Sequence, residues 1–197
     1  MKNTLLPIVV ITLISACTSM SQQVYTKDQT EVKQGITYDK HTHQPLNGML
    51  KAYQSDQVLK YEIPLKNGLQ EGTGRLYDDK GRLERTIPFK NDKQEGVVQF
   101  FYPSGQLRAT LPYHDDQPDG VLMTYYESGK LMGTGTYVKG KLEGAEKTYF
   151  ESGQLQREVL YVHDVKEGSF KEWDEAGHLI VDKTYHHDGL EKSVLSP

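Results

Sequence analysis

Six consecutive blocks of 24 residues, without insertion or deletion, occupy residues 48–191 of this 197-residue chain. Each block begins with glycine, has an aromatic residue at its sixth position and leucine at its twelfth, and ends with an acidic residue. The eighteenth position is Leu65 in the first block and aromatic in the other five. A fixed period of this length predicts a repeat architecture, in which each unit buries its apolar residues against its neighbours. Residues that vary between blocks are then free to determine specificity.

The residues within each block predict two β-strands. Five blocks place a glycine three residues after an aromatic-rich run, and leucine follows two residues later, which suits a short hairpin loop with a left-handed glycine. These loop glycines are Gly81, Gly105, Gly129, Gly153 and Gly177, and Gln57 takes the place in the first block. A second turn follows the eighteenth position, again with residues that tolerate positive φ. Positions 12, 16 and 18 share one strand face and are mostly apolar, whereas positions 13, 15 and 17 are mostly polar or proline, so we expect a sheet with one apolar face.

The column of acidic residues that ends each block favours one arrangement of these strands. The carboxylates would stack at about 4.8 Å in a coiled solenoid but lie about 9.6 Å apart in an antiparallel meander. The wider spacing approaches the screening length of about 10 Å in 0.1 M salt, so we predict an all-β, elongated and twisted meander of six β-hairpin repeats. Pro64, Pro88 and Pro112 at position 17 each remove a hydrogen-bond donor, and we expect bulged or short strands there.

The repeat resembles the MORN-repeat variant family over residues 48–191. The segments YYESGKL at 125–131 and YFESGQL at 149–155 carry the resemblance most clearly. It implies a repeat fold, and the family includes many bacterial antitoxins and immunity partners of toxins. The first block departs from the pattern at residues 55–57, and the sixth has Lys183 where an apolar residue is usual. Capping is expected at these ends: residues 35–47 look like a half-repeat cap, and residues 192–197 form a tail.

The N-terminus resembles the signal of a bacterial lipoprotein. Lys2 precedes an apolar run from Leu5 to Ile14, and the small residues Ser15 and Ala16 directly precede Cys17, the only cysteine. Ten apolar residues span roughly 15 Å as a helix, too short for a permanent transmembrane segment. We therefore expect a signal peptide at 1–16, lipidation at Cys17 and a flexible tether over 17–34. An ordinary signal peptide with a free thiol is the alternative. Thr18 resembles the pattern that sorts lipoproteins to the outer membrane, facing the periplasm.

The sequence contains no set of residues that predicts an enzyme. Five histidines lie in the turns of their blocks, where polar residues are expected anyway: His114, His163, His178, His186 and His187. His41 and His43 lie at the opposite end of the array from His186 and His187, without cysteine or a close carboxylate pattern, so we predict no metal site and no cofactor. A formal net charge of −4 argues against nucleic acid as a partner.

Surplus aromatic residues in the third to fifth blocks predict a protein-binding surface. Most aromatics at positions 6 and 18 are expected to pack the sheet, but additional ones beside them would leave a contiguous exposed patch. The predicted contact residues are Phe100, Phe101, Tyr102, Tyr125, Tyr126 and Phe150. Two functions with a specific ligand remain open: an immunity or antitoxin-type protein that neutralises a toxin in the periplasm, and a scaffold that binds peptidoglycan or another glycan. A structural role in the envelope without a specific ligand is a third possibility. Glycan binding predicts equivalent exposed aromatics in every block, whereas a protein partner predicts one irregular patch.

Overall fold

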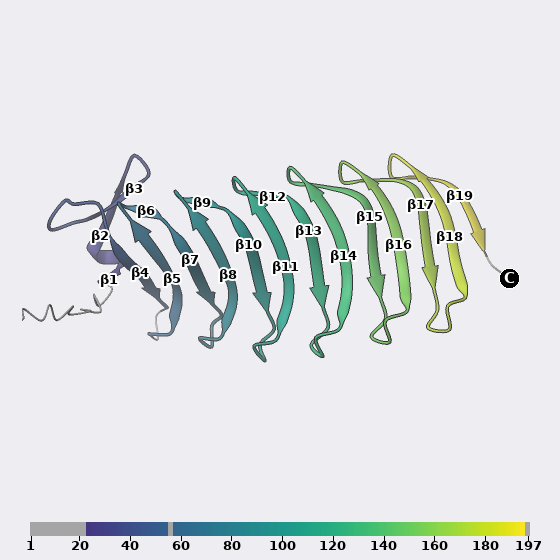
Figure 1. Ribbon diagram of the computed structural model, residues 1–197, viewed down its shortest axis with the longest axis horizontal. Coiled ribbons are helices and arrows are strands. Elements are labelled where there is room, and N and C mark those ends of the chain that lie inside the picture. The colour runs from purple at the N-terminus through teal and green to yellow at the C-terminus, as the bar shows by residue number, and fades with distance from the viewer. Residues whose placement is uncertain (1–22, 55–56, 196–197) are drawn as a thin grey trace, which may run out of the picture.

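The repeats form one long sheet in which the strands lie side by side in chain order (Figure 1). The computed structural model describes residues 23–54 and 57–195. Neighbouring strands pair antiparallel throughout, except that β1 pairs parallel with β4. The predicted elongated meander is confirmed.

The large sheet has seventeen strands, and a small two-stranded sheet lies at its N-terminal end. The large sheet comprises β1 (Val24–Thr26), β4 (Gly48–Tyr53), β5 (Leu59–Lys66), β6 (Leu69–Gln70), β7 (Gly72–Tyr77), β8 (Leu83–Lys90), β9 (Lys93–Gln94), β10 (Gly96–Phe101), β11 (Leu107–His114), β12 (Gln117–Pro118), β13 (Gly120–Tyr125), β14 (Leu131–Val138), β15 (Lys141–Tyr149), β16 (Leu155–Val162), β17 (Val165–Trp173), β18 (Leu179–His186) and β19 (Gly189–Leu195). The small sheet pairs β2 (Thr30–Lys33) with β3 (Ile36–Asp39), and the 3-10 helix η1 (Lys27–Gln29) precedes it.

Both predicted kinds of turn are present. The five hairpin glycines have φ between 75° and 91°, and Gln57 takes the same role in the first block with φ 66°. The second turns have two consecutive residues with positive φ, as a tight hairpin turn of the primed type requires. We call the edge of the sheet that these turns form the turn edge; its residue pairs are 67–68, 91–92, 115–116, 139–140, 163–164 and 187–188.

The position-17 prolines affect the strand that follows them rather than their own strand. Pro64 lies within the eight-residue strand β5, but the next strand is split into β6 and β7. The N–H of Glu71 donates to the Pro64 carbonyl at 3.0 Å, and proline has no N–H to return the bond. In the fourth block Thr136 occupies this position and pairs with Glu143, so the following strand β15 is continuous. The expected short strands therefore occur one strand later than the prolines themselves.

The sheet has one apolar and one polar face, set by the register of the hairpins. In the third block Val98 pairs with Leu111 and Phe100 with Ala109, and side chains of paired residues lie on the same face. We call the face carrying positions 3, 5, 14 and 16 the apolar face, and the one carrying positions 2, 4, 15 and 17 the polar face. In every block the register shifts between positions 5 and 6, which leaves position 13 as an extra, bulged residue.

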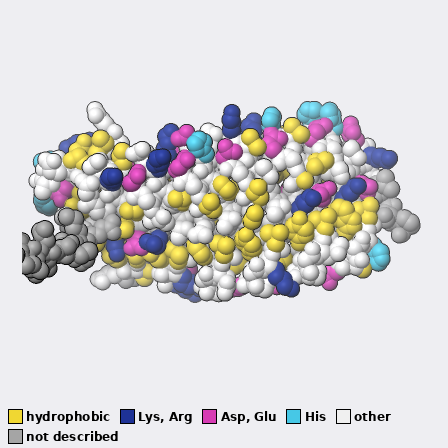
Figure 2. Space-filling model, viewed as in Figure 1, with side chains coloured by type: hydrophobic (Ala, Val, Ile, Leu, Met, Phe, Trp, Pro, Cys, Tyr) yellow, Lys and Arg dark blue, Asp and Glu magenta, His cyan; other side chains and the backbone are white. Residues whose placement is uncertain are grey.

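The buried core is thin and follows the length of the sheet. Seven hydrophobic residues are buried among those described: Tyr25, Leu46, Leu65, Ile87, Val98, Ala109 and Val159. Figure 2 shows hydrophobic side chains in a band along most of the molecule, with charged and histidine side chains gathered along the upper edge, where the turns lie in Figure 1. A thin core leaves much apolar surface accessible to partners.

The N-terminal end of the sheet is covered by residues that we expected to belong partly to a tether. Tyr25 in β1 and Leu46 pack with Leu65 of the first block, and Leu46 is only 1% exposed. The N–H of Gly68 donates to the Leu46 carbonyl at 2.8 Å, so this segment pairs with the first turn as a neighbouring block would. Residues from Val24 onward are therefore folded, and the prediction of a flexible tether up to residue 34 extended too far. The predicted signal peptide and Cys17 lie outside the described residues.

Candidate binding surface

A shallow groove on the apolar face lies between the third and fourth blocks. Its volume is about 500 Å³, and it is lined by Phe100, Tyr102, Arg108, Ala109, Leu111, Leu122, Thr124 and Met132. These residues come from β10, β11, β13 and β14 and from the hairpin loop that begins at Tyr102. The walls are mostly apolar, and Arg108 is the one cation among them.

The bulge at position 13 explains how Arg108 and Met132 reach this groove. Simple alternation would place a side chain at position 13 opposite its neighbour at position 14. Because the bulge inserts an extra residue, Arg108 lines the same groove as Ala109, and Met132 joins it from the next block. The Arg108 guanidinium lies 5.8 Å from the centroid of the Phe100 ring, which is within the range of a cation–π contact.

Hollows also lie at other block boundaries, but the residues at the positions that line this groove differ from block to block. Position 5 is Phe100 in the third block but Thr148 in the fifth and Glu172 in the sixth. Position 13 is Met132 in the fourth block and Lys60 in the first. The apolar chemistry of this wall therefore belongs to the middle of the array rather than to the repeat.

The apolar face becomes charged toward the C-terminus. Glu146 and Arg157 of the fifth block form an ion pair at 3.7 Å, and Lys183 of the sixth lies 5.7 Å from the Phe170 ring centroid. Burial raises the pKa of Tyr137, and the nearby Glu146 carboxylate adds to this effect, so the phenol stays neutral at physiological pH. The mostly apolar part of this face thus ends close to the groove, and even there Arg85 pairs with Phe100 and Arg108 lines the groove.

The structure brings together only some of the six aromatic residues predicted as contacts. Phe100 and Tyr102 line the groove, and Phe101 lies in the adjoining hollow, which shares Tyr102 and Arg108 with it. Phe150 lines a separate hollow between the fifth and sixth blocks, together with Trp173. The predicted single patch is therefore divided.

Two of the predicted tyrosines have their hydroxyl groups engaged within the protein. The Tyr102 hydroxyl donates to the Tyr125 carbonyl at 2.7 Å, and the Tyr126 hydroxyl donates to the Tyr149 carbonyl at 2.6 Å. Each bond joins one hairpin loop to the following block. Both side chains are half-buried, so these tyrosines connect blocks as well as exposing part of their rings.

Tyr125 reaches the opposite face of the sheet. Its hydroxyl lies 3.4 Å from the Met123 sulfur. Met123 lies between Leu122 and Thr124 on β13, and both of those residues line the groove, so alternation places Met123 on the polar face. Tyr125 does not extend the groove.

Sequence reasoning missed the aliphatic part of the groove, Leu111, Leu122 and Met132. The predicted contact residues were all aromatic, whereas a residue that departs from the repeat at one position indicates where the groove lies. Position 13 is polar in four of the six blocks, and Met132 breaks that pattern.

Comparison with known proteins agrees with the repeat and adds little about function. The family model described as "MORN repeat variant" matches residues 94–115, 118–139, 142–163 and 166–187. No curated protein matches the chain. The structure described as "Crystal structure of GtfA/B complex bound to UDP and GlcNAc" aligns at 16% identity over 59% of this chain and 24% of that one, with a TM-score of 0.26. This chain spans about a quarter of that one's length, and nothing about function is inferred from so weak a likeness.

No helix among the residues that the structure describes is long and apolar enough to cross a membrane.

Proposed function

We propose that this protein is a non-catalytic lipoprotein of the bacterial envelope that binds another protein through its repeat surface, as an immunity or antitoxin-type protein that neutralises a toxin in the periplasm. The observation that carries the proposal is the single apolar groove between the third and fourth blocks. A surface built from repeats offers one extended face, and the residues that break the repeat determine where a partner binds.

The chemistry of the groove suits a protein side chain. Phe100, Leu111, Leu122 and Met132 supply apolar walls, and Arg108 at the rim offers a charge to an acidic group. Aromatic residues, methionine and arginine are enriched in protein–protein interfaces, and an apolar residue inserted into such a groove is a typical hot spot. An occupied groove would account for half-exposed apolar residues that the thin core leaves uncovered.

The envelope location rests on the sequence of the N-terminus. The segment Leu5–Ile14 followed by Ser15, Ala16 and Cys17 supports export and acylation, and Thr18 supports the outer membrane. Residues 18–22 would then join the lipid anchor to the folded part, which begins near β1. The repeat surface would face the periplasm, where an incoming toxin is accessible.

One feature favours the alternative, a glycan-binding scaffold. The hollow between the fifth and sixth blocks combines Phe150 and Trp173 with the polar side chains of Gln156 and Glu172. An aromatic platform with polar neighbours suits a sugar ring. Hollows at the first and second block boundaries also place aromatic side chains beside acidic ones, as expected for a polymer held along the array. The groove between the third and fourth blocks differs from these hollows because no acidic residue lines it.

The test is co-purification with the full-length lipoprotein in detergent, using substitutions that other blocks already contain. Phe100→Thr introduces the residue found at Thr124 and Thr148, and Met132→Lys introduces the residue found at Lys60. The double variant removes the apolar wall of the groove while keeping residues that this fold accommodates. We expect a stoichiometric protein partner to be retained by the wild type, and its affinity to fall 100-fold or more in the double variant, since hot-spot losses reach about 2–4 kcal/mol.

The matched control changes the polar face of the same blocks. Val97→Thr introduces the residue at Thr73, and Met123→Lys the residue at Lys51 and Lys147. This control is expected to retain the partner. Equal loss in both double variants would count against the groove, and retention on peptidoglycan without any protein partner would replace the proposal by the glycan-binding scaffold.

A further inference from the structure

The turn edge contains a recurring contact between a carboxylate and the following turn. The acidic residue that ends a block accepts a hydrogen bond from the backbone N–H of the residue twenty positions later, at the first of the two positive-φ positions. The bonds are Asn91 N–H to Glu71, Asp115 N–H to Glu95, His163 N–H to Glu143 and His187 N–H to Glu167, at 3.0, 3.2, 3.1 and 2.9 Å. In these four places the acidic column fixes a turn to the preceding block.

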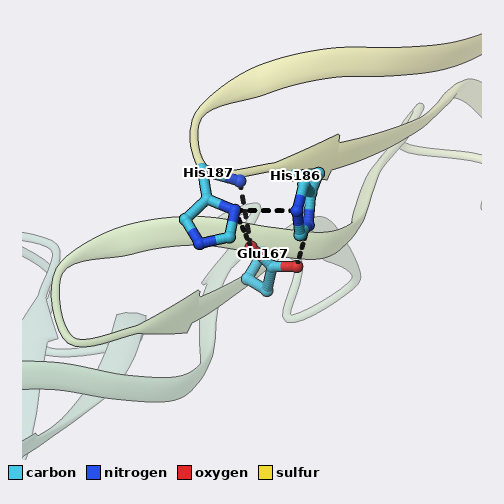
Figure 3. A group of neighbouring side chains, drawn as sticks. All are labelled: Glu167, His186 and His187. Carbon is cyan, nitrogen blue, oxygen red and sulfur yellow. Dashed lines mark hydrogen bonds and ion pairs between the residues drawn. The ribbon is translucent and has the colours of Figure 1, made fainter.

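At the last turn two imidazole rings join this carboxylate (Figure 3). His186 ends β18, and His187 follows it with φ 50°. Because His187 has a left-handed rather than an extended backbone, its side chain does not point away from that of His186, and the ring centroids are 4.1 Å apart. One ligand atom from each of Glu167, His186 and His187 lies within 4.8 Å of the others.

His186 takes part in two hydrogen bonds that a bound ion would replace. Its Nδ1 lies 2.6 Å from Glu167 Oε1, so the ring donates its Nδ1 proton to this carboxylate. The lone pair of Nε2 is then directed toward His187 Nδ1, 2.9 Å away. An ion bound by His186 Nε2, His187 Nδ1 and Glu167 would displace the His187 Nδ1 proton and break the bond between His186 Nδ1 and Glu167, because one carboxylate cannot both accept from this ring and bind the same ion.

The remaining distances are close to those of a coordination sphere. With metal–nitrogen bonds of about 2.0–2.1 Å, neighbouring ligand atoms of a tetrahedral site lie about 3.3–3.4 Å apart. His186 Nε2 and His187 Nδ1 are 2.9 Å apart, and His187 Nδ1 and Glu167 Oε2 are 3.7 Å apart. Each of these two separations needs to change by about 0.4 Å, and the Glu167 carboxylate has to rotate away from His186 Nδ1 to complete the site.

Other turns contain one histidine of this arrangement but not two. His163 is equivalent to His187 and contacts Glu143, but Val162 precedes it in place of His186. His114 is equivalent to His186 and lies 3.1 Å from Glu95, but Asp115 follows it in place of His187. Within residues 23–54 and 57–195, Glu167, His186 and His187 are the one group whose ligand atoms converge in this way.

We propose that Glu167, His186 and His187 bind a divalent transition-metal ion, with zinc as the best match. Two imidazole nitrogens and one carboxylate oxygen suit a borderline cation, and the fourth position is open to water or to a partner's side chain. The ion would join β17 to the turn between β18 and β19, and so stabilise the C-terminal end of the array. This inference is independent of the proposed protein-binding function.

The test is zinc titration of the full chain by isothermal calorimetry, with Cys17→Ser in every variant so that a free thiol does not compete. We expect one zinc ion per chain. Replacing a ligand with a residue that other blocks have at the same position should weaken binding at least tenfold, a loss that even an outer-shell change can cause. The variants are His187→Asn, as at Asn67 and Asn91, and His186→Val, as at Val138 and Val162.

His163→Asn is the matched control, because it makes the same substitution at the same turn position one block earlier. It should leave zinc affinity unchanged. Amide chemical shifts give a second readout: zinc should shift the resonances of Glu167 and His187 and leave those of Glu143 and His163 in place. Absence of zinc binding in the wild type, undiminished binding in His187→Asn, or equal weakening by His163→Asn would overturn the proposal.

Discussion

Replacing the first glycine of a block by alanine tests how the repeat depends on that residue. In all six blocks this glycine has positive φ, between 77° and 154°. The blocks differ in what surrounds it. A Cβ at Gly120 would lie 2.7 Å from Cγ and 2.9 Å from Cβ of Pro112, whereas a Cβ at Gly144 would have no atom within 4 Å. The two positions therefore separate backbone strain from crowding.

The expected losses of stability follow from these two terms. Gly144 has φ 77°, close to the left-handed helical region, where alanine costs about 1–2 kcal/mol. Gly120 has φ 135°, a region with a cost of about 1–3 kcal/mol for a residue with a side chain. Overlap with Pro112 adds about 1–3 kcal/mol of overpacking. Gly120→Ala should therefore reduce the free energy of unfolding by about 2 kcal/mol more than Gly144→Ala.

The assay is urea denaturation of the purified chain followed by far-ultraviolet circular dichroism. A double-mutant cycle isolates the crowding, because Pro112→Ala removes the Cγ atom at 2.7 Å. In the Gly120→Ala background, we expect Pro112→Ala to restore about 1 kcal/mol of the free energy of unfolding. Equal losses for Gly120→Ala and Gly144→Ala would refute the crowding argument, and a neutral Gly144→Ala would refute the argument from backbone conformation.

Three further predictions concern the turn edge and the anchor. Asp164→Gly keeps a residue that tolerates positive φ, as Gly140 shows, but removes the 2.7 Å hydrogen bond from the Leu142 N–H to the Asp164 carboxylate. The free energy of unfolding should fall by about 1 kcal/mol, and hydrogen exchange at Leu142 should become faster. The hydrogen bond and charge of Glu95 raise the pKa of His114 above its ordinary 6.5, so this contact adds stability below pH 6.5 and loses it as the pH rises through the folded-state pKa. The urea midpoints of the wild type and His114→Val should therefore approach each other as the pH rises. A difference between the two midpoints that stays constant with pH would contradict a stabilising contact between His114 and Glu95. Cys17→Ser should abolish incorporation of labelled palmitate, whereas incorporation that persists would exclude Cys17 as the anchor.

The periodic features of the fold were predictable from the sequence because each is encoded locally and repeated. Glycines at the hairpin loops and residues tolerant of positive φ at the second turns specified where the chain reverses. The effect of the prolines was harder to place, because a missing donor on one strand acts on its partner. Pro64 thus splits the strand that follows it, which is a property of pairing rather than of local sequence.

The N-terminal segment was misjudged for a related reason. Residues 24–33 are polar and low in aromatic content, which is typical of a linker. Their folding depends on contacts with a distant part of the chain: β1 pairs with β4, and Tyr25 packs against Leu65. A strand that completes the edge of an existing sheet needs few apolar residues of its own.

The candidate sites were predicted less completely than the fold. The bulge at position 13 breaks the alternation along its strand, so that Arg108 and Met132 line the groove, and alternation from position 5 to position 6 places the Tyr125 hydroxyl on the polar face. Counting aromatic residues could not reveal this. Glu167 is nineteen residues from His186 in the sequence, and the two meet only because β17 and β18 pair antiparallel.

Photo-crosslinking at two methionines tests the central claim most directly. Met132 lines the groove, and Met123 lies on the polar face of the adjacent strand. Each would be replaced in turn, as Met132→p-benzoylphenylalanine and Met123→p-benzoylphenylalanine, in the full-length protein within cells that produce it. We predict a discrete protein adduct from position 132 and none from position 123. An adduct from position 123 alone, or none from either position, would contradict a protein-binding groove between the third and fourth blocks.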